Sequence, residues 1–188
     1  MIRVINRKFK AVVFALLVVL AGNTTYADAS DEASAAKYKL HAVFLYNFIG
    51  SVEWPKLVYT GNVKNVDVCI IGRDTLGAII DTVAKKAESK GDIKINVRRG
   101  VSHADVAGCN IAYISKSEEA NIAAITAKTK DSATLTVSEV GGFAKSGGVI
   151  EFVLNGSSVS FIVNNKNAKA VDLKINPQLL EVAQEVIN

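Results

Sequence analysis

The stretch that decides the fold of this chain is YKLHAVFLYNFIGSVEWP, residues 38–55. Its apolar side chains recur at helical spacing, and one stripe of them comprises Tyr38, Ala42, Leu45, Phe48, Ile49 and Val52. The other sides of this helix are also apolar, at Val43, Phe44 and Tyr46. A helix that is apolar almost all round is buried, either in a core or under a partner. Pro55 has no N–H and disfavours helix at the residue before it, so we expect the helix to end at Trp54.

Asn47 is the polar exception in this predicted helix. A buried amide must be hydrogen bonded, because leaving it unsatisfied costs about 1–3 kcal/mol. Two roles follow from burial. Asn47 either ties the helix to a neighbouring loop or fixes the register of a packed interface.

The first 27 residues have the pattern of a secretory signal peptide. A basic segment with Arg3 and Lys10 precedes an apolar run over residues 11–21, and Thr25-Tyr26-Ala27 offers a cleavage site. The alternative is an uncleaved anchor, but a membrane span needs about 20 apolar residues, more than this run provides. We therefore expect export to the periplasm, cleavage near Ala27, and a single domain over residues 28–188.

Cleavage changes the charge of the chain. The full sequence has 22 Lys and Arg against 18 Asp and Glu, and the leader contains four basic residues and no acidic one. The mature chain is therefore formally neutral. Its composition gives no support for nucleic-acid binding.

Cys69 and Cys109 are the two cysteines of the chain. Because an exported protein meets an oxidising compartment, an even pair predicts a disulfide. It would close a loop of about 40 residues and stabilise the fold by roughly 4 kcal/mol in the chain-entropy model. The alternative is two buried free thiols.

Apolar runs and amphipathic stretches alternate along the rest of the chain. Strands are expected at residues 66–71, 93–98, 110–114 and 134–137, and helices at residues 74–90, 117–128, 166–171 and 177–186. This order favours parallel pairing with right-handed crossovers. Asn155-Gly156, between apolar runs at residues 147–154 and 157–163, signals an antiparallel hairpin. Residues 28–36 are polar and small, and we expect a loose segment there.

These elements predict an α/β fold. We expect a mixed, mainly parallel sheet with helices on both faces, in a Rossmann-like three-layer arrangement, followed by the C-terminal antiparallel hairpin.

Several motifs resemble the YfiR family. Phe44-Leu45-Tyr46-Asn47-Phe48 and Val52-Glu53-Trp54-Pro55 are similar to its opening signature. The Gly-rich segment GGFAKSGG, residues 141–148, and Phe161-Ile162-Val163-Asn164 are similar to its later motifs. The resemblance covers roughly residues 35–186. The residues that carry it include Asn47, Glu53, Trp54, Pro55 and Asn164.

The resemblance implies a periplasmic regulatory protein. The best-known relatives repress a membrane-bound diguanylate cyclase, so the expected partner is the periplasmic part of such a cyclase. An outer-membrane lipoprotein that captures the repressor and a second copy of the chain are further expected partners. Relatives often carry a second cysteine pair around the Gly-rich loop, which this chain lacks.

Partner contacts are expected at exposed apolar residues of the hairpin and the Gly-rich loop, namely Phe143, Val149 and Phe152. Phe143 has an alternative role, in which it plugs the core. Glu53 is part of the family signature, and its alternative role is a carboxylate bonded to backbone at a helix end.

A small-ligand receptor is the alternative function. Its ligand would lie at the carboxyl ends of the parallel strands, near Arg73, Ser138 and Phe143. Residues 72–77 form either a plain strand-to-helix turn or a weak anion site.

An enzyme is not expected. His41 and His103 are the only histidines, and no carboxylate cluster accompanies either, so we expect no metal site. The sequence has no nucleophile elbow and no paired carboxylates for acid–base chemistry. We expect no cofactor.

Overall fold

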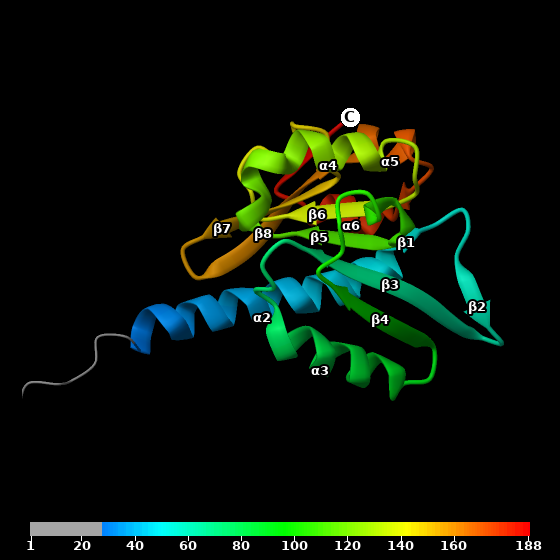
Figure 1. The fold of residues 1–188 in the computed structure, drawn as a ribbon, viewed down its shortest axis with the longest axis horizontal. Coiled ribbons are helices and arrows are strands. Elements are labelled where there is room, and N and C mark those ends of the chain that lie inside the picture. Colours follow the sequence, from blue (N-terminus) through cyan, green and yellow to red (C-terminus); the bar gives the residue numbers. More distant parts are fainter. Residues whose placement is uncertain (1–27) are drawn as a thin grey trace, which may run out of the picture. The chain divides into compact units, whose positions relative to one another are not determined.

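An eight-stranded sheet lies at the centre of the unit Ala35–Asn188 (Figure 1). The computed structural model describes residues 28–188, so the predicted signal peptide lies outside the described residues. Residues 28–34 form the start of the first helix and group apart from this unit.

The long strand β3 organises the sheet. It has parallel neighbours on both sides, β4 and β5, and the order continues through β6 and β7, also parallel. The order in which the strands are added therefore reverses between β3 and β5, as in doubly wound α/β folds. These strands span Val63–Ile71 (β3), Ile93–Arg99 (β4), Ile111–Ile114 (β5), Leu135–Ser138 (β6) and Ile150–Asn155 (β7).

Three further strands complete the sheet. Strand β8 (Ser158–Asn164) is antiparallel to β7, β10 (Glu185–Ile187) is parallel to β8, and β2 (Val58–Thr60) is antiparallel to the start of β3. The predicted β7–β8 hairpin is confirmed, but its turn lies one residue later than Asn155-Gly156. Asn155 pairs with Ser158, and Gly156 has a φ of +63°, which fits a type II′ turn with Gly first.

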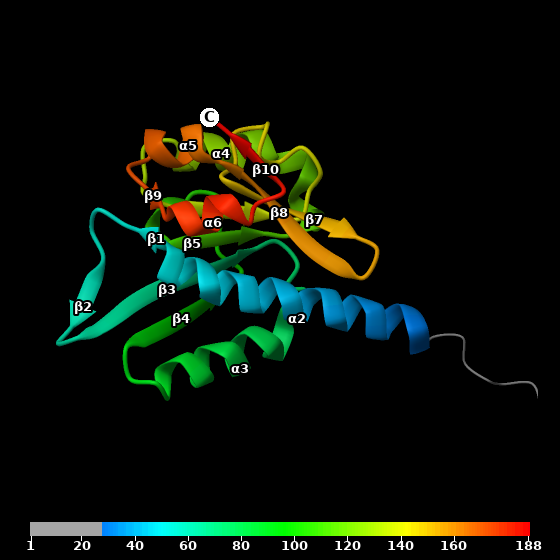
Figure 2. The same cartoon turned by 180° about the vertical axis from the view of Figure 1, so that it is seen from behind.

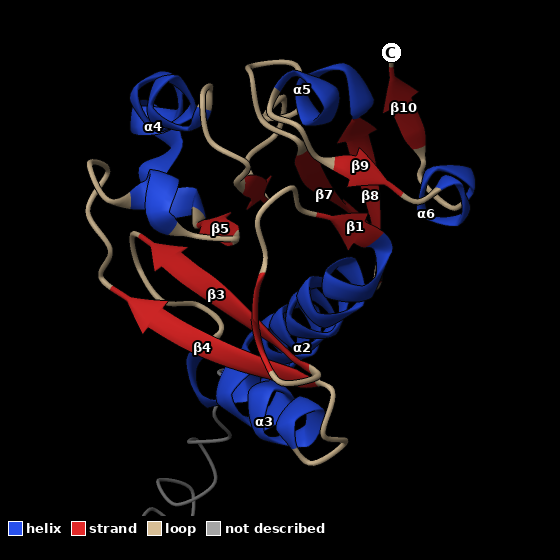
Figure 3. Ribbon diagram, turned by 90° about the vertical axis from the view of Figure 1, so that its right-hand side faces the viewer, coloured by secondary structure: helices blue, strands red, loops and turns tan. Residues whose placement is uncertain are grey.

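Helices cover both faces of the sheet, so the predicted three-layer α/β fold is confirmed (Figure 3). Strand residues Val66, Val68 and Ile70 pack with helices α2 (Asp28–Ser51) and α3 (Gly77–Glu88). The alternate residues Cys69 and Ile71 pack with α4 (Ile122–Thr129) on the other face, which follows a 3-10 segment, Lys116–Asn121. This alternation is the two-residue period of a strand buried on both sides.

The first helix differs from its prediction at both ends. It begins at Asp28, so residues 28–36 are helical and not loose, and it ends at Ser51 instead of Trp54. Val52–Glu53 form a short strand, β1, antiparallel to β9 (Lys174–Ile175). The amide of Asn176 donates to the Ser51 carbonyl at 2.9 Å, so tertiary pairing ends the helix before Pro55 can act.

The predicted helix over residues 177–186 is wrong in its second half. Helix α5 (Asn165–Ala170) follows β8, and helix α6 is limited to Pro177–Glu181. The residues after it enter the sheet as β10, because the open edge of β8 offers them hydrogen bonds; the Gln184 amide donates to the Phe161 carbonyl at 2.8 Å.

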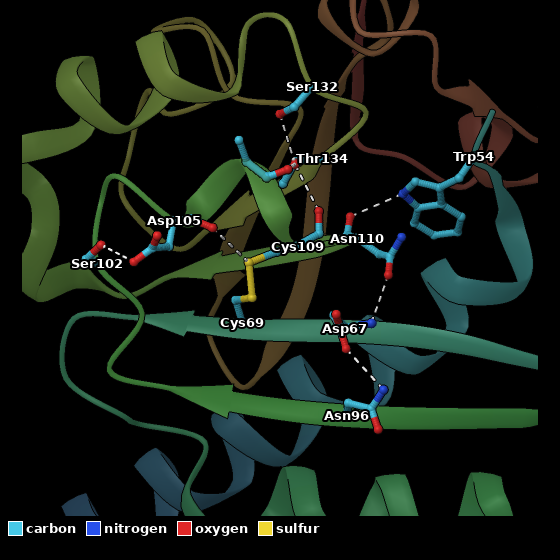
Figure 4. The surroundings of a disulfide bond; sticks show 11 residues. Trp54, Asp67, Cys69, Asn96, Ser102, Asp105, Cys109, Asn110, Ser132 and Thr134 are labelled. Atoms are coloured by element: carbon cyan, nitrogen blue, oxygen red, sulfur yellow. Dashed lines mark hydrogen bonds between the residues drawn. A yellow bond between two sulfur atoms is a disulfide. The ribbon is translucent and has the colours of Figure 1, made fainter. Parts of the chain in front are cut away.

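The predicted Cys69–Cys109 disulfide is present (Figure 4), with a Cα–Cα distance of 5.9 Å. It connects β3 to the turn that precedes β5, at the place where the order of the strands reverses. Next to it, the Asn110 side chain accepts from the Asp67 amide at 2.8 Å, and Trp54 Nε1 donates to the Asn110 carbonyl at 3.2 Å. The disulfide and these bonds connect the residue after β1, strand β3 and the residues before β5.

Removing this disulfide should destabilise the protein. The double variant Cys69→Ala/Cys109→Ala frees a loop whose ends are 40 residues apart. We expect the free energy of unfolding to fall by about 4 kcal/mol, measured by urea denaturation. The matched comparison is the wild type with and without a thiol reductant. A midpoint that does not change in either case would contradict the expected stabilisation.

Candidate functional site

The three residues that we expected on the surface are buried. Phe143, Val149 and Phe152 are 1%, 3% and 4% exposed, so the expectation that they form an exposed contact surface is wrong. Phe143 packs with Ile122 and Ile125 under α4, which confirms its alternative role as a core plug. Phe152 lies under α2 on the opposite face of the sheet.

The Gly-rich loop is folded inward because buried polar groups hold its backbone. The Glu151 carboxylate accepts from the amides of Gly142 and Ala144 at 2.9 and 3.0 Å. Asn164 Nδ2 donates to the Ala144 carbonyl at 2.7 Å. Its Oδ1 also accepts from the Asn167 amide and so caps α5. Asn164 and Glu151 therefore both hold the backbone of this loop in place. Glu151 was not identified from the sequence.

The other family-signature residues lie at the end of α2. Trp54 is 8% exposed, whereas Glu53 and Pro55 are exposed. The Glu53 carboxylate makes no backbone hydrogen bond within residues 28–188, contrary to its alternative role. Together they line a groove of about 420 Å³ with Lys169, Asp172, Leu173 and Lys174.

Asn47 is exposed and its side chain is tied to no loop of the described residues, so its first predicted role is wrong, whereas its role in the register of a packed interface stays a prediction. Within the part of the chain that the structure describes, its side-chain amide makes no hydrogen bond. Leu40 and Val43 on the same helix are 37% and 41% exposed. The sequence of α2 is apolar almost all round, but only one of its faces packs on the sheet.

The carboxyl-end crevice between β3 and β5 is filled by the chain itself. A Cβ atom at Gly72 would lie 2.5 Å from Ser117 Oγ and 2.6 Å from Ser115 Oγ. The Arg73 amide donates to Ser117 Oγ at 2.9 Å, and Asp74 Oδ1 accepts from the amides that open α3. The amides that would hold an anion are therefore bonded to the chain's own side chains. This favours the plain strand-to-helix turn.

The ligand-site residues predicted for this crevice do not form an open site together. Arg73 is exposed, but Ser138 is fully buried. Ser138 Oγ donates to the Ile114 carbonyl at 2.7 Å and accepts from the Val140 amide at 3.1 Å. Its hydroxyl therefore serves the turn after β6.

A buried polar cluster joins α2 to the carboxyl ends of the central strands. His41 Nδ1 lies 3.1 Å from the Tyr113 hydroxyl, which in turn donates to Glu139 Oε1 at 3.4 Å. Lys37 Nζ forms an ion pair with Glu139 Oε2 at 2.7 Å. The His41 ring stacks on Phe152, with centroids 4.2 Å apart and planes at 8°. Lys37 and His41 are one turn apart on α2, so the cluster fastens that part of the helix.

Burial sets the protonation of this cluster. Desolvation lowers the pKa of His41 to about 4, with the nearby Glu139 charge opposing that shift, so the ring is neutral at neutral pH. Desolvation and the charge of Glu139 raise the pKa of Tyr113. Burial lowers the pKa of Lys37, but the hydrogen bond and charge of Glu139 outweigh it and leave that pKa above its usual value. His41, Tyr113 and Lys37 are therefore not poised to exchange a proton near pH 7.

No three His, Cys, Asp or Glu side chains of residues 28–188 gather closely enough to hold a metal ion. His103 is partly exposed and its Nε2 lies 2.9 Å from Glu118 Oε2. Among the helices that the structure describes, none is long and apolar enough to cross a membrane.

The chain is thus a small α/β domain in which the clusters of polar side chains connect its own helices, strands and loops. The chain belongs to the YfiR/HmsC-like family, a family of regulatory proteins, whose model matches residues 38–184. The sequence resemblance to the YfiR family is therefore confirmed. No curated protein shows significant sequence similarity to the chain.

Two solved structures are similar to the chain at low identity, and the first of them shares its fold. A conserved domain protein from Vibrio cholerae O1 biovar eltor is 10% identical, with a TM-score of 0.53 over 79% of this chain. The match covers 60% of the length of that structure. An ABC domain from Streptococcus pneumonia in complex with L-Trp is 10% identical, with a TM-score of 0.48, and covers 65% of this chain and 55% of its own.

Protonation of His41 should destabilise the fold in acid. The unfolded chain takes up this proton below pH 6.5, whereas the folded chain resists it until about pH 4. The contribution of neutral His41 to the free energy of unfolding is therefore fully present above pH 6.5. It falls as the pH is lowered, by about 3 kcal/mol at pH 4. The measurement is urea denaturation of wild type and His41→Gln between pH 7 and 4. A pH slope in this window that is equal in both proteins would contradict the assignment.

Gly148 should tolerate no side chain. A Cβ atom there would lie 2.1 Å from the Phe143 ring, and we expect Gly148→Ala to destabilise the fold by about 1–3 kcal/mol through overpacking. Gly141→Ala, in the same loop with nothing within 4 Å of its Cβ, is the matched control and should change stability little. Thermal unfolding of both variants makes the comparison, and equal melting temperatures would show that Phe143 has room to move.

Proposed function

We propose that this protein is a periplasmic regulator that binds the periplasmic part of an inner-membrane diguanylate cyclase and represses it. The observation that carries the proposal is the family match over residues 38–184. The signal-peptide pattern of residues 1–27 agrees with work in the periplasm. The outcome would be lower cyclic-di-GMP signalling.

Repression needs only a difference in affinity. If the regulator binds the inactive conformation of the cyclase more tightly than the active one, it shifts the population toward the inactive state. Shifting an equilibrium from 1:99 to 99:1 requires about a 10⁴-fold preference. A rigid, disulfide-tied body supports such selectivity, because its surface does not adapt to both states.

We further propose that the protein is not an enzyme. The titratable residues of the buried cluster are engaged with one another, and Tyr113 and His41 are both neutral near pH 7. An outer-membrane lipoprotein that captures the repressor, and a second copy of the chain, remain part of the proposal as partners.

A small-ligand receptor is the second candidate. The carboxyl-end crevice is filled by Ser115 and Ser117, so a ligand would enter a different place. A groove of about 350 Å³ between α4 and α5 favours this candidate. Its lining includes Thr126, Thr136 and Asn167. A thermal-shift screen with metabolites separates the candidates, because a ligand of the native state raises the melting temperature.

Deleting the gene should raise the cellular cyclic-di-GMP level, because the cyclase loses its repressor. The measurement is cyclic-di-GMP in extracts of the deletion strain and of the same strain complemented with the full chain. The matched control is complementation with residues 28–188 alone, which lack the predicted leader and should not restore repression. A level that stays the same after deletion in a strain that expresses its diguanylate cyclases would contradict the proposal.

A further inference from the structure

A groove runs between helices α2 and α3, which lie side by side on one face of the sheet (Figure 2). Its volume is about 220 Å³. We call it the α2–α3 groove, and it is lined by Val43, Tyr46, Asn47, Val83, Lys86, Ala87 and Lys90. Both helices contribute apolar side chains to its walls.

The charged residues that line the α2–α3 groove have one sign. They are Lys86 and Lys90, and no carboxylate is among its lining residues. Lys90 Nζ lies 3.1 Å from the Tyr46 hydroxyl and 5.1 Å from the centre of the Tyr46 ring, which holds its charge over the groove. The groove therefore combines an apolar floor with a positive rim.

The outer face of α2 extends this surface. Leu40, Val43 and Asn47 follow one another at the three- and four-residue spacing of one helix face, and all three are exposed. Leu40 and Val43 are two of the five large apolar residues that stand exposed among the described residues. The free amide of Asn47 sits at the groove itself. The exposed parts of Leu40 and Val43 and the side-chain amide of Asn47 are therefore available to a partner.

We propose that the α2–α3 groove binds an acidic amphipathic helix of the partner protein. The inference rests on the proposed function, in which this partner is the periplasmic part of the cyclase. A helix that lies in a groove presents side chains at i, i+3, i+4 and i+7, which matches the row on α2. Acidic residues beside its apolar stripe would meet Lys86 and Lys90.

The same features disfavour other occupants. A second copy placed by a two-fold axis on this groove would bring the lysines of both copies together, and like charges repel. A bilayer surface is flat and is held by larger groups of basic residues, whereas the groove is concave and has two lysines. An acidic helix satisfies both the shape and the charge.

The test compares two groove variants with a surface control. Val43→Glu places a negative charge on the apolar row, and Lys86→Glu/Lys90→Glu reverses the rim. The control, Lys116→Glu/Lys128→Glu, reverses two exposed lysines on the α4 side of the sheet. The probe is the purified periplasmic part of the cyclase that responds to the gene deletion, and the measurement is its dissociation constant by calorimetry. Thermal melting checks that every variant is folded, as expected for exposed positions.

We expect both groove variants to weaken binding by about tenfold or more, and the control by less than about twofold. The loss caused by Lys86→Glu/Lys90→Glu should shrink as salt is raised, because salt screens the lost attraction. Wild-type affinity in folded groove variants would overturn the inference while leaving the proposed function intact. No binding or repression by the wild type would overturn the proposed function itself.

Two further outcomes would reassign the groove. In sedimentation velocity, a wild-type dimer that Val43→Glu dissociates, with cyclase affinity unchanged, would make the groove a contact between copies. In flotation with vesicles of phosphatidylglycerol, wild-type binding that Lys86→Glu/Lys90→Glu abolishes, again with cyclase affinity unchanged, would make it a lipid site. Either result overturns the acidic-helix proposal.

Discussion

The packing of helix α2 against the β7–β8 hairpin is the interaction on which the rest of the structure depends. Phe44 and Phe48 on the helix meet Phe152 and Phe161 on the strands, with ring centroids 5.5–6.0 Å apart. Burying one large apolar side chain contributes about 1.5–3 kcal/mol, and aromatic pairs add to this. Because the hairpin follows the parallel strands along the chain, this contact connects the N-terminal helix to strands near the C-terminus.

That contact also explains the polar cluster at the other end of the helix. Once Phe152 lies under α2, His41 is stacked on its ring and removed from water. A buried imidazole needs a hydrogen-bond partner, which Tyr113 supplies from β5. Glu139 then holds Lys37 at the carboxyl end of β6. One apolar contact and one polar cluster therefore fix both the position and the rotation of α2.

Fixing the rotation of α2 decides which of its side chains face solvent. Val43 and Asn47 are turned toward α3, where Lys86 and Lys90 stand. The stable interior and the proposed binding surface are thus two faces of one helix. Such a fixed surface fits the proposed function, because a surface held in one shape would bind one conformation of a partner more tightly than another. The disulfide at the switch in strand order gives the same rigidity to the sheet.

The sequence by itself determined the class of fold, the disulfide and the family. Helical spacing and two-residue alternation are local signals, and an even pair of cysteines in an exported chain favours a disulfide. The tertiary structure alone decided where α2 ends, that the last residues form β10, and that Phe143, Val149 and Phe152 are buried while Asn47 is exposed. These outcomes depend on which neighbour supplies hydrogen bonds or covers a face. That information lies in residues distant along the chain, such as Lys174 for Glu53 and Phe161 for Gln184.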